Sequence, residues 1–152
     1  MQQNEFRFDT YCGGYCGACP QFIATENGTV DALAARTNTT PDEVLCYGCK
    51  SDVLCGWCKI CPLKKCAEGK GLEFCGDCAE YPCDDLQKHI DNPDYPYHSM
   101  VPRQMYEIKA LGIDAWLVKE EKRWRCPACN ARFSWFDSVC PTCGNKTRSW
   151  SE

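Results

Sequence analysis

Cysteine is the residue type whose number and spacing indicate chemistry in this chain, with sixteen cysteines among 152 residues. Several follow the C-x2-C spacing, with which a short turn presents two thiolates to one metal ion. A cysteine-free stretch of 42 residues precedes the last group. The three groups, all of which we interpret as metal ligands, are Cys12, Cys16 and Cys19; Cys46, Cys49, Cys55, Cys58, Cys61, Cys66, Cys75, Cys78 and Cys83; and Cys126, Cys129, Cys140 and Cys143.

The last group has the pattern of a zinc ribbon. Its two turns, Cys126-Pro-Ala-Cys129 and Cys140-Pro-Thr-Cys143, are separated by ten residues. Two such turns joined by a hairpin build a tetrahedral four-cysteine zinc site, and we expect residues 132–136 to form a hairpin strand. A mononuclear iron site of the rubredoxin type is the competing interpretation.

The first twelve cysteines divide evenly into three four-cysteine sites, so the whole chain would bind about four Zn²⁺ ions. Their spacing does not determine which thiols share a site. The triplets that begin at Cys12 and at Cys75 each need a ligand from elsewhere, which predicts cross-linking of the N-terminal and central segments. Structural zinc contributes roughly 10–16 kcal/mol in small peptides, while a domain is stable by only about 5–15 kcal/mol. Removal of the metals should therefore unfold residues 12–83.

An iron–sulfur cluster is the alternative for this part of the chain. Cys55, Cys58, Cys61 and Cys66 resemble a ferredoxin run, but four residues rather than three precede the last cysteine, and the proline follows the third cysteine. The opening C-x3-C-x2-C is also the cluster motif of radical-SAM enzymes, which need a much longer scaffold. A redox-active C-x2-C needs a βαβ context that the sequence lacks.

No catalytic constellation is recognisable in the sequence. His89 and His98 are the only histidines, and neither has a Ser or Asp partner motif. A closed four-cysteine site also lacks an open coordination position for hydrolysis. We therefore expect a non-enzymatic zinc-binding module that interacts with a protein or a nucleic acid, with an iron–sulfur electron carrier as the alternative.

Charge and compartment limit the partners. The N-terminal residues contain no apolar signal segment, and no stretch is long enough to span a bilayer. We expect a cytoplasmic protein, whose reduced thiols favour metal over disulfides; eight disulfides in a secreted protein are the alternative. The net charge is −4, but residues 1–118 carry 10 basic and 17 acidic side chains, whereas residues 119–152 carry 7 basic and 4 acidic ones. Only the C-terminal segment has the basic bias that suits a polyanion.

Aromatic and basic side chains surround the ribbon cysteines. They could stack on bases or bind a protein partner. Alternatively, the aromatics shield the metal of a segment that has almost no core, and the basic groups offset its charge. These residues are Trp124, Arg125, Arg132, Phe133, Trp135, Phe136, Lys146, Arg148 and Trp150.

Short helices must position all of these groups. We expect Trp116 and Leu117 to face a core and residues 119–122 to face solvent. The fold class predicted is a small metal-stabilised α+β fold: a cysteine-rich multi-zinc domain over residues 1–95, a helical connection over 96–123 and a zinc ribbon over 124–152. Hydrophobic periodicity and helix-start and helix-stop residues predict helices over 21–36, 62–68, 82–91, 102–111 and 114–122. The first of these should break at Asn27-Gly28, and a further helix should begin at Pro41 after the N-cap Thr40. Residues 94–98 should form a loop.

Three stretches carry a family resemblance: Cys12-Gly-Gly-Tyr-Cys-Gly-Ala-Cys-Pro20, Cys46-Tyr-Gly-Cys49-Lys-Ser51 and Lys70-Gly-Leu-Glu-Phe-Cys-Gly-Asp-Cys-Ala-Glu-Tyr-Pro-Cys83. This pattern resembles the uncharacterised cysteine-rich family called domain of unknown function 3795, over roughly residues 8–95. The ribbon looks like an extension that some members carry. The resemblance implies a small cytoplasmic prokaryotic protein that binds metal, and it implies no reaction.

Overall fold

The structure, a computed structural model, describes residues 5–148 and 150, and this part of the chain is mostly short helices. No helix in it is both long and apolar enough to cross a membrane. The α-helices are α1 (Pro20–Asn27), α2 (Val30–Thr37), α3 (Pro41–Val44), α4 (Gly56–Lys59), α5 (Pro62–Gly69), α6 (Asp84–Ile90), α7 (Val101–Leu111) and α8 (Ile113–Arg123), and the 3-10 helices are η1 (Cys16–Ala18), η2 (Cys75–Asp77) and η3 (Pro96–Met100).

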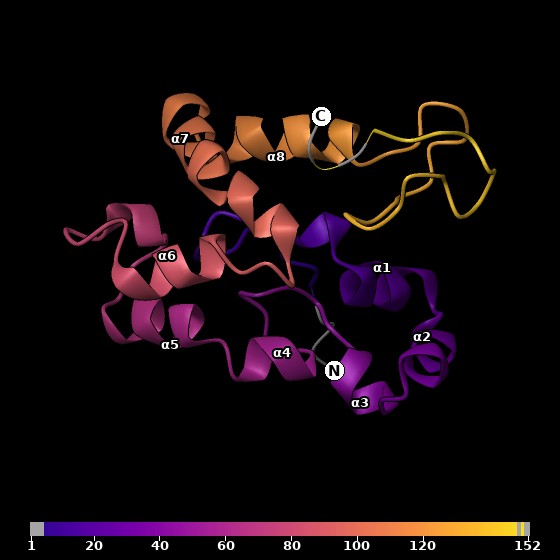
Figure 1. Ribbon diagram of the computed structural model, residues 1–152, viewed down its shortest axis with the longest axis horizontal. Helices are drawn as coiled ribbons and strands as arrows, with labels where there is room; N and C mark the ends of the chain where they lie inside the picture. The colour runs from indigo at the N-terminus through magenta and orange to yellow at the C-terminus, as the bar shows by residue number, and fades with distance from the viewer. Residues whose placement is uncertain (1–4, 149, 151–152) are drawn as a thin grey trace.

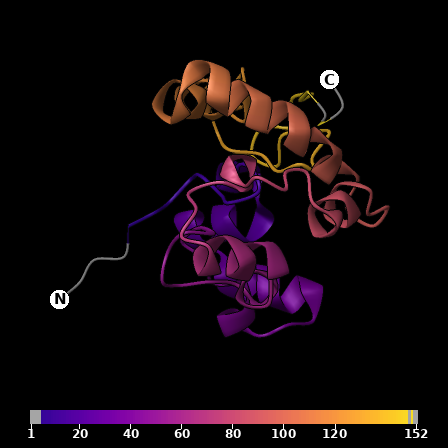
Figure 2. The same ribbon diagram turned by 90° about the vertical axis from the view of Figure 1, so that its left-hand side faces the viewer.

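These helices form two layers. In Figure 1, α7 and α8 lie across the top beside the C-terminal segment, and α1 to α6 lie below them. The view turned by 90° separates the same two layers (Figure 2). The cysteine-rich helices therefore form one layer, and the late helices with the C-terminal turns form the other.

Local signals determine where the N-terminal helices begin and end. Gly28 ends α1 in a left-handed conformation with φ of 72°, which glycine adopts without a Cβ penalty. At the start of α3, the amide of Thr40 donates to Oε2 of Glu43 over 2.8 Å, half of a capping box. The predicted break at Asn27-Gly28 and the predicted N-cap at Thr40 are both confirmed.

One aromatic core joins the two layers. Tyr15, Trp116, Trp124 and Phe133 are each at most 1% exposed and belong to one packed cluster. The rings of Tyr15 and Trp116 meet edge-on, with centroids 6.1 Å apart. The burial predicted for Trp116 is confirmed. The N-terminal segment, α8 and the C-terminal turns therefore share a core.

The predicted β-hairpin of the ribbon is not confirmed. Among the described residues there are only isolated bridges, of which Arg125 with Arg132 and Val139 with Lys146 lie in this segment. In the predicted strand, the amide of Ser134 donates to Oδ2 of Asp137, and the amide of Trp135 donates to the carbonyl of Ala18. These amides do not pair with a facing strand, and the part of the chain that the structure describes is mostly helical, so the β part of the predicted α+β fold is not confirmed.

The last turn of α8 buries an acidic residue for which solvent exposure was expected. Glu120 is 3% exposed, and its Oε2 accepts a hydrogen bond of 2.8 Å from Nε1 of Trp124. The two residues lie four positions apart, about one helical turn. Burial raises the pKa of Glu120. The prediction that residues 119–122 all face solvent was therefore wrong at Glu120, because Trp124 brings a buried hydrogen-bond donor to it.

Candidate metal centres

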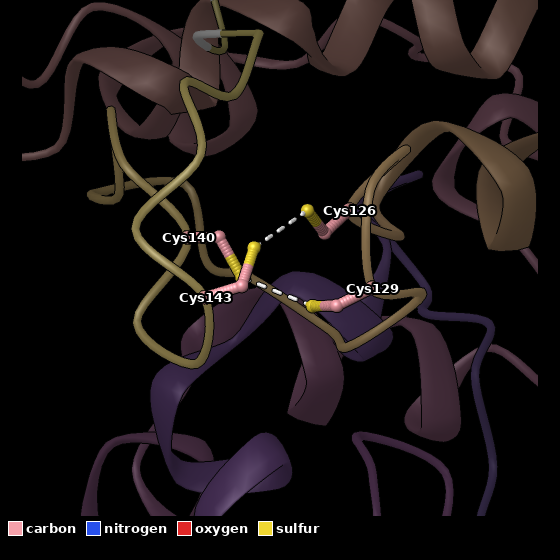
Figure 3. Close-up of side chains that lie close together, drawn as sticks. All are labelled: Cys126, Cys129, Cys140 and Cys143. Atoms are coloured by element: carbon pink, nitrogen blue, oxygen red, sulfur yellow. Dashed lines mark hydrogen bonds between the residues drawn. The ribbon is translucent and has the colours of Figure 1, made fainter.

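The four C-terminal cysteines form a compact group of sulfur atoms (Figure 3). All four sulfurs lie within 4.8 Å of one another. The distances between Sγ of Cys126 and Cys143 and between Sγ of Cys129 and Cys140 are both 3.6 Å. In a tetrahedral site with metal–sulfur bonds of about 2.3 Å, neighbouring sulfurs lie about 3.8 Å apart. The group therefore fits a single four-coordinate metal ion.

Backbone amides stabilise a thiolate in each of these two turns. The amide of Ala128 donates to Sγ of Cys126 over 3.4 Å, and the pKa of Cys126 is lowered chiefly by the amide of Cys129. The amide of Cys143 likewise lowers the pKa of Cys140 to about 7. Because the thiolate is the form that binds metal, each turn contains one cysteine that is already prepared as a ligand.

A second compact group lies in the cysteine-rich layer. The sulfurs of Cys46, Cys55 and Cys58 lie within 4.8 Å of one another. Cys55 is the N-cap of α4 and Cys58 lies within that helix, whose formation we did not predict from the sequence. Hydrogen bonds from the thiols of Cys55 and Cys58 lower the pKa of Cys46 to about 3. Three thiols that could bind one metal ion are therefore already together.

A cavity of about 220 Å³ adjoins this group. The amide of Cys49 donates to Sγ of Cys16 over 3.3 Å at this cavity. Burial raises the pKa of Cys16 well above its usual value, and raises those of Cys19 and Cys49 to about 12. Thiols buried in this way become thiolates at neutral pH only beside a compensating cation. The cysteines that line the cavity are Cys12, Cys16, Cys19, Cys49, Cys55, Cys58 and Cys61.

The four remaining cysteines, Cys66, Cys75, Cys78 and Cys83, line a separate and smaller cavity. Every predicted ligand thus lies in the C-terminal group, in the group of three, or at one of the two cavities. Within residues 5–148 and 150, the two compact groups are those in which at least three ligand atoms lie within 4.8 Å of one another. The other nine predicted ligands are not brought that close together.

His89 and His98 stack on each other at the edge of the larger cavity. Their ring centroids lie 3.7 Å apart, with 16° between the ring planes. Nδ1–H of His98 donates to the carbonyl oxygen of His89 over 3.1 Å. Burial lowers the pKa of both rings, that of His89 to about 4. Both rings are therefore neutral at pH 7, an arrangement that is invisible in a sequence where they lie nine positions apart.

The C-terminal segment closes one wall of the same cavity. Trp135 stacks on Tyr97 with ring centroids 4.1 Å apart and 11° between the planes. Phe136 meets the same tyrosine edge-on. Both aromatics line the cavity, so they contribute to the shielding of the cysteine-rich layer. Trp124 and Phe133, by contrast, are buried in the aromatic core.

The basic side chains around the C-terminal cysteines differ in accessibility. The side chain of Arg132 is 3% exposed and pairs with Glu26 over 2.6 Å and with Glu121 over 2.9 Å. It is therefore unavailable to a partner. Five other basic residues line a cleft of about 350 Å³ on the C-terminal segment and the end of α8, namely Lys122, Arg123, Arg125, Lys146 and Arg148.

Comparison with known proteins places the chain in a family without assigning it a reaction. No curated protein and no solved structure matches it significantly. The profile of a family described as "Protein of unknown function (DUF3795)" matches residues 8–88. The match covers more than half of the chain and contains the first twelve cysteines, whereas the four C-terminal cysteines lie outside it. The chain therefore belongs to the DUF3795 family of proteins of unknown function.

Proposed function

We propose that this protein is a non-enzymatic zinc-binding module whose metal sites hold the fold and whose C-terminal segment binds a partner. The observation that carries the proposal is the C-terminal group of sulfurs, with two Sγ–Sγ distances of 3.6 Å. Zinc accepts four thiolates in a tetrahedron, and four protein ligands leave no coordination position for a substrate. This arrangement is typical of structural zinc and supports a binding role rather than catalysis.

Cys19 is our assignment for the fourth ligand of the group formed by Cys46, Cys55 and Cys58. It lines the cavity that Cys55 and Cys58 also line. Burial and then the charge of Cys55 are the two largest causes of its raised pKa, so the two thiols lie within electrostatic range. The Cys19 thiol also donates to Oε1 of Gln21 over 3.1 Å, a bond that metal binding would replace.

Elemental analysis combined with an absorption spectrum tests the metal, on protein purified without oxygen. We expect about four zinc ions per chain and no visible absorption band. The double variant Cys126→Ser/Cys140→Ser should lose one zinc ion, because it removes one ligand from each C-terminal turn. Iron in place of zinc, or a metal content unchanged in the double variant, would contradict the proposal.

An iron–sulfur cluster is the second candidate, favoured by one observation. The larger cavity has a volume of about 220 Å³ and is lined by seven cysteines, more space and more sulfur than one tetrahedral ion requires. A cluster held there would make the protein an electron carrier. Iron with acid-labile sulfide and a brown colour would support this candidate, while zinc alone would exclude it.

The partner that we propose is a nucleic acid bound at the basic cleft. Five basic residues line the cleft, and its lining includes no acidic residue. Lys122, Lys146 and Arg148 are exposed there. Arg125 pairs with Glu121 over 2.8 Å, so its charge is partly neutralised. Basic side chains gathered in one cleft suit contact with phosphates, the main source of sequence-independent affinity for nucleic acids.

Salt-dependent binding to a DNA or RNA oligonucleotide tests the cleft. Replacing Lys122, Lys146 and Arg148 with Glu should abolish binding together with its dependence on salt. The matched control replaces Lys59, Lys65 and Lys88, three exposed lysines of the other layer, with Glu. It makes the same change in net charge and should retain binding. Equal losses of oligonucleotide affinity in both triple variants would indicate an effect of net charge alone and would reject the cleft as the binding site.

A further inference from the structure

The smaller cavity lies where α5, η2 and the start of α6 meet, and has a volume of about 30 Å³. We propose that Cys66, Cys75, Cys78 and Cys83, which line it, together bind a third metal centre, distinct from the two compact groups. The inference rests on the proposed metal-binding function and deepens it. The ligand class is a thiophilic metal, as a single zinc ion or a small iron–sulfur cluster, because four thiols dominate the donor set.

The backbone presents these thiols as metal-binding turns do. In the turn Cys75-Gly76-Asp77-Cys78, the amide of Cys78 donates to the carbonyl of Cys75 over 3.0 Å. The turn Cys16-Gly17-Ala18-Cys19 makes the same bond with the same length. Both are single 3-10 turns that end at a cysteine in extended conformation. The second turn is therefore a local copy of the first.

The other two ligands come from the helices on either side. Cys66 lies within α5, and Cys83 is the N-cap of α6, in extended conformation. The amide of Cys75 donates to the carbonyl of Tyr11 over 2.6 Å, which ties the turn to the N-terminal segment. A metal bound here would connect α5, η2 and α6, which are separated by loops in the sequence.

A lysine lies beside one of the four sulfurs. Nζ of Lys70, which lines the cavity, donates to Sγ of Cys78 over 3.3 Å and to Oε2 of Glu80 over 3.1 Å. An ammonium group at this position would offset part of the double negative charge that four thiolates leave on one bound zinc ion.

The packing of this region is too sparse to hold it without a cross-link. Its hydrophobic cluster has three buried members, Leu63, Leu86 and Val101, and cysteines pack against them. Cores of this size rarely hold a small domain without metal or disulfide. The four sulfurs are less tightly gathered than those of the C-terminal group, so we expect zinc to draw them together or a cluster to hold them at their wider spacing.

Thiol alkylation of the complete metal-loaded protein, read by mass spectrometry, tests this assignment. Cys66 is exposed, as are Cys129 and Cys143 of the C-terminal group, so an unligated Cys66 would react quickly. We expect Cys66 to react at least about tenfold more slowly before chelation of the metal than after it. Cys129 and Cys143 should behave in the same way and serve as internal controls.

The outcomes separate this inference from the proposed function. Rapid alkylation of Cys66 while Cys129 and Cys143 stay protected would overturn the third site and leave metal binding in place. Rapid alkylation of all three would reject metal binding itself. The variant Cys66→Ser/Cys78→Ser should lose one metal centre while Cys129 and Cys143 remain protected. Whether zinc or iron with sulfide is lost identifies the centre.

Discussion

At the residue scale, Gly48 shows why the cysteine-rich layer tolerates only one residue type at a critical turn. It lies between Cys46 and Cys49, with φ of 117°, and an added Cβ would overlap the carbonyl oxygen of Arg7. The amide of Arg7 donates to the carbonyl of Tyr47 over 2.8 Å in the same place. The N-terminal segment therefore crosses this turn closely enough to exclude any side chain.

We predict that Gly48→Ala lowers the free energy of unfolding by about 2–4 kcal/mol, because it combines an unfavourable φ with a backbone overlap. It should also weaken metal retention, since the turn carries Cys46. Urea unfolding with parallel zinc analysis measures both effects. Gly28→Ala is the matched control: φ is 72° there and nothing lies within 4 Å, so a loss of only about 1 kcal/mol is expected from the left-handed conformation. Equal effects in the two variants would refute the overlap.

The stacked histidines predict a dependence of stability on pH. The pKa of His89 is about 4 in the folded chain, lowered by burial and by His98, against about 6.5 when unfolded. Between pH 4 and pH 6.5 the unfolded chain therefore binds more protons than the folded chain. The contribution of His89 to the free energy of unfolding is fully present above about pH 6.5 and is lost as the pH falls toward 4. At pH 5.5 the loss from His89 should be about 1 kcal/mol.

Acid also protonates thiolates and releases metal, so the test compares two proteins at the same pH. We expect His89→Phe, which keeps an aromatic ring, to lose about 1 kcal/mol less than the parent chain between pH 7.5 and 5.5. Urea unfolding at a fixed free zinc concentration measures the difference. Identical losses of unfolding free energy in the two proteins would show that the pKa of His89 does not differ between the folded and unfolded chains.

At the scale of the elements, α8 joins the two layers through the carboxylate of Glu121. This group accepts a hydrogen bond of 2.7 Å from the hydroxyl of Tyr15. It also pairs with Arg132 over 2.9 Å and with Arg125 over 2.8 Å. Arg132 reaches Glu26 on α1 as well. The carboxylate of Glu121 thus connects the N-terminal segment, α8 and the C-terminal turns. Arg132 connects α1 to the same network through its pair with Glu26.

We predict that Arg132→Met lowers the free energy of unfolding by about 2–3 kcal/mol. Removing one partner of a buried pair costs about 3–5 kcal/mol, and the two carboxylates keep partial access to solvent, which reduces that cost. Arg125→Ala breaks a pair on the same carboxylate, but the Arg125 side chain is 29% exposed, so less than about 1 kcal/mol is expected. Thermal unfolding of both variants measures the difference, and a larger effect in Arg125→Ala would contradict the network.

At the scale of the whole molecule, three small apolar clusters are found among the residues that the structure describes. The aromatic core has six buried members, the cluster beneath α1 to α3 has four, and the cluster between α5 and α6 has three. Each is small for a self-sufficient core. Cysteines that we propose as metal ligands pack against the third cluster, so we expect metal cross-links and apolar contacts to stabilise the fold together.

Metal removal should therefore unfold most of the cysteine-rich layer. Structural sites contribute roughly 10–16 kcal/mol each in small peptides, so several of them together exceed the roughly 5–15 kcal/mol by which a whole domain is stable. We expect a strong chelator, under reducing conditions, to abolish most of the helical circular dichroism, and added zinc to restore it. Retention of the helical signal in protein that elemental analysis shows to be metal-free would contradict this prediction.

Much of the local structure was predictable from the sequence. The break at Asn27-Gly28 and the capping box at Thr40 were both predicted, as was α7, expected over 102–111 and observed as Val101–Leu111. Each depends on residues within one or two turns of each other. The loop expected over 94–98 was partly wrong, because η3 begins at Pro96 and stacks His98 on His89. The ribbon strand expected over 132–136 is not confirmed, because the amide of Trp135 donates to the distant carbonyl of Ala18 rather than to a facing strand.

The sequence by itself determined the chemistry, because thiol number and C-x2-C spacing are local properties that survive any folding of the chain. Only the tertiary structure decided which thiols face the same cavity, since Cys66 on α5 and Cys83 at the start of α6 line one cavity between these helices. It also decided that Arg132 is buried while Lys146 and Arg148 are exposed. These three side chains carry the same charge, but only Arg132 is buried, because it pairs with Glu26 on α1 and Glu121 on α8. No local sequence pattern records contacts with such distant elements.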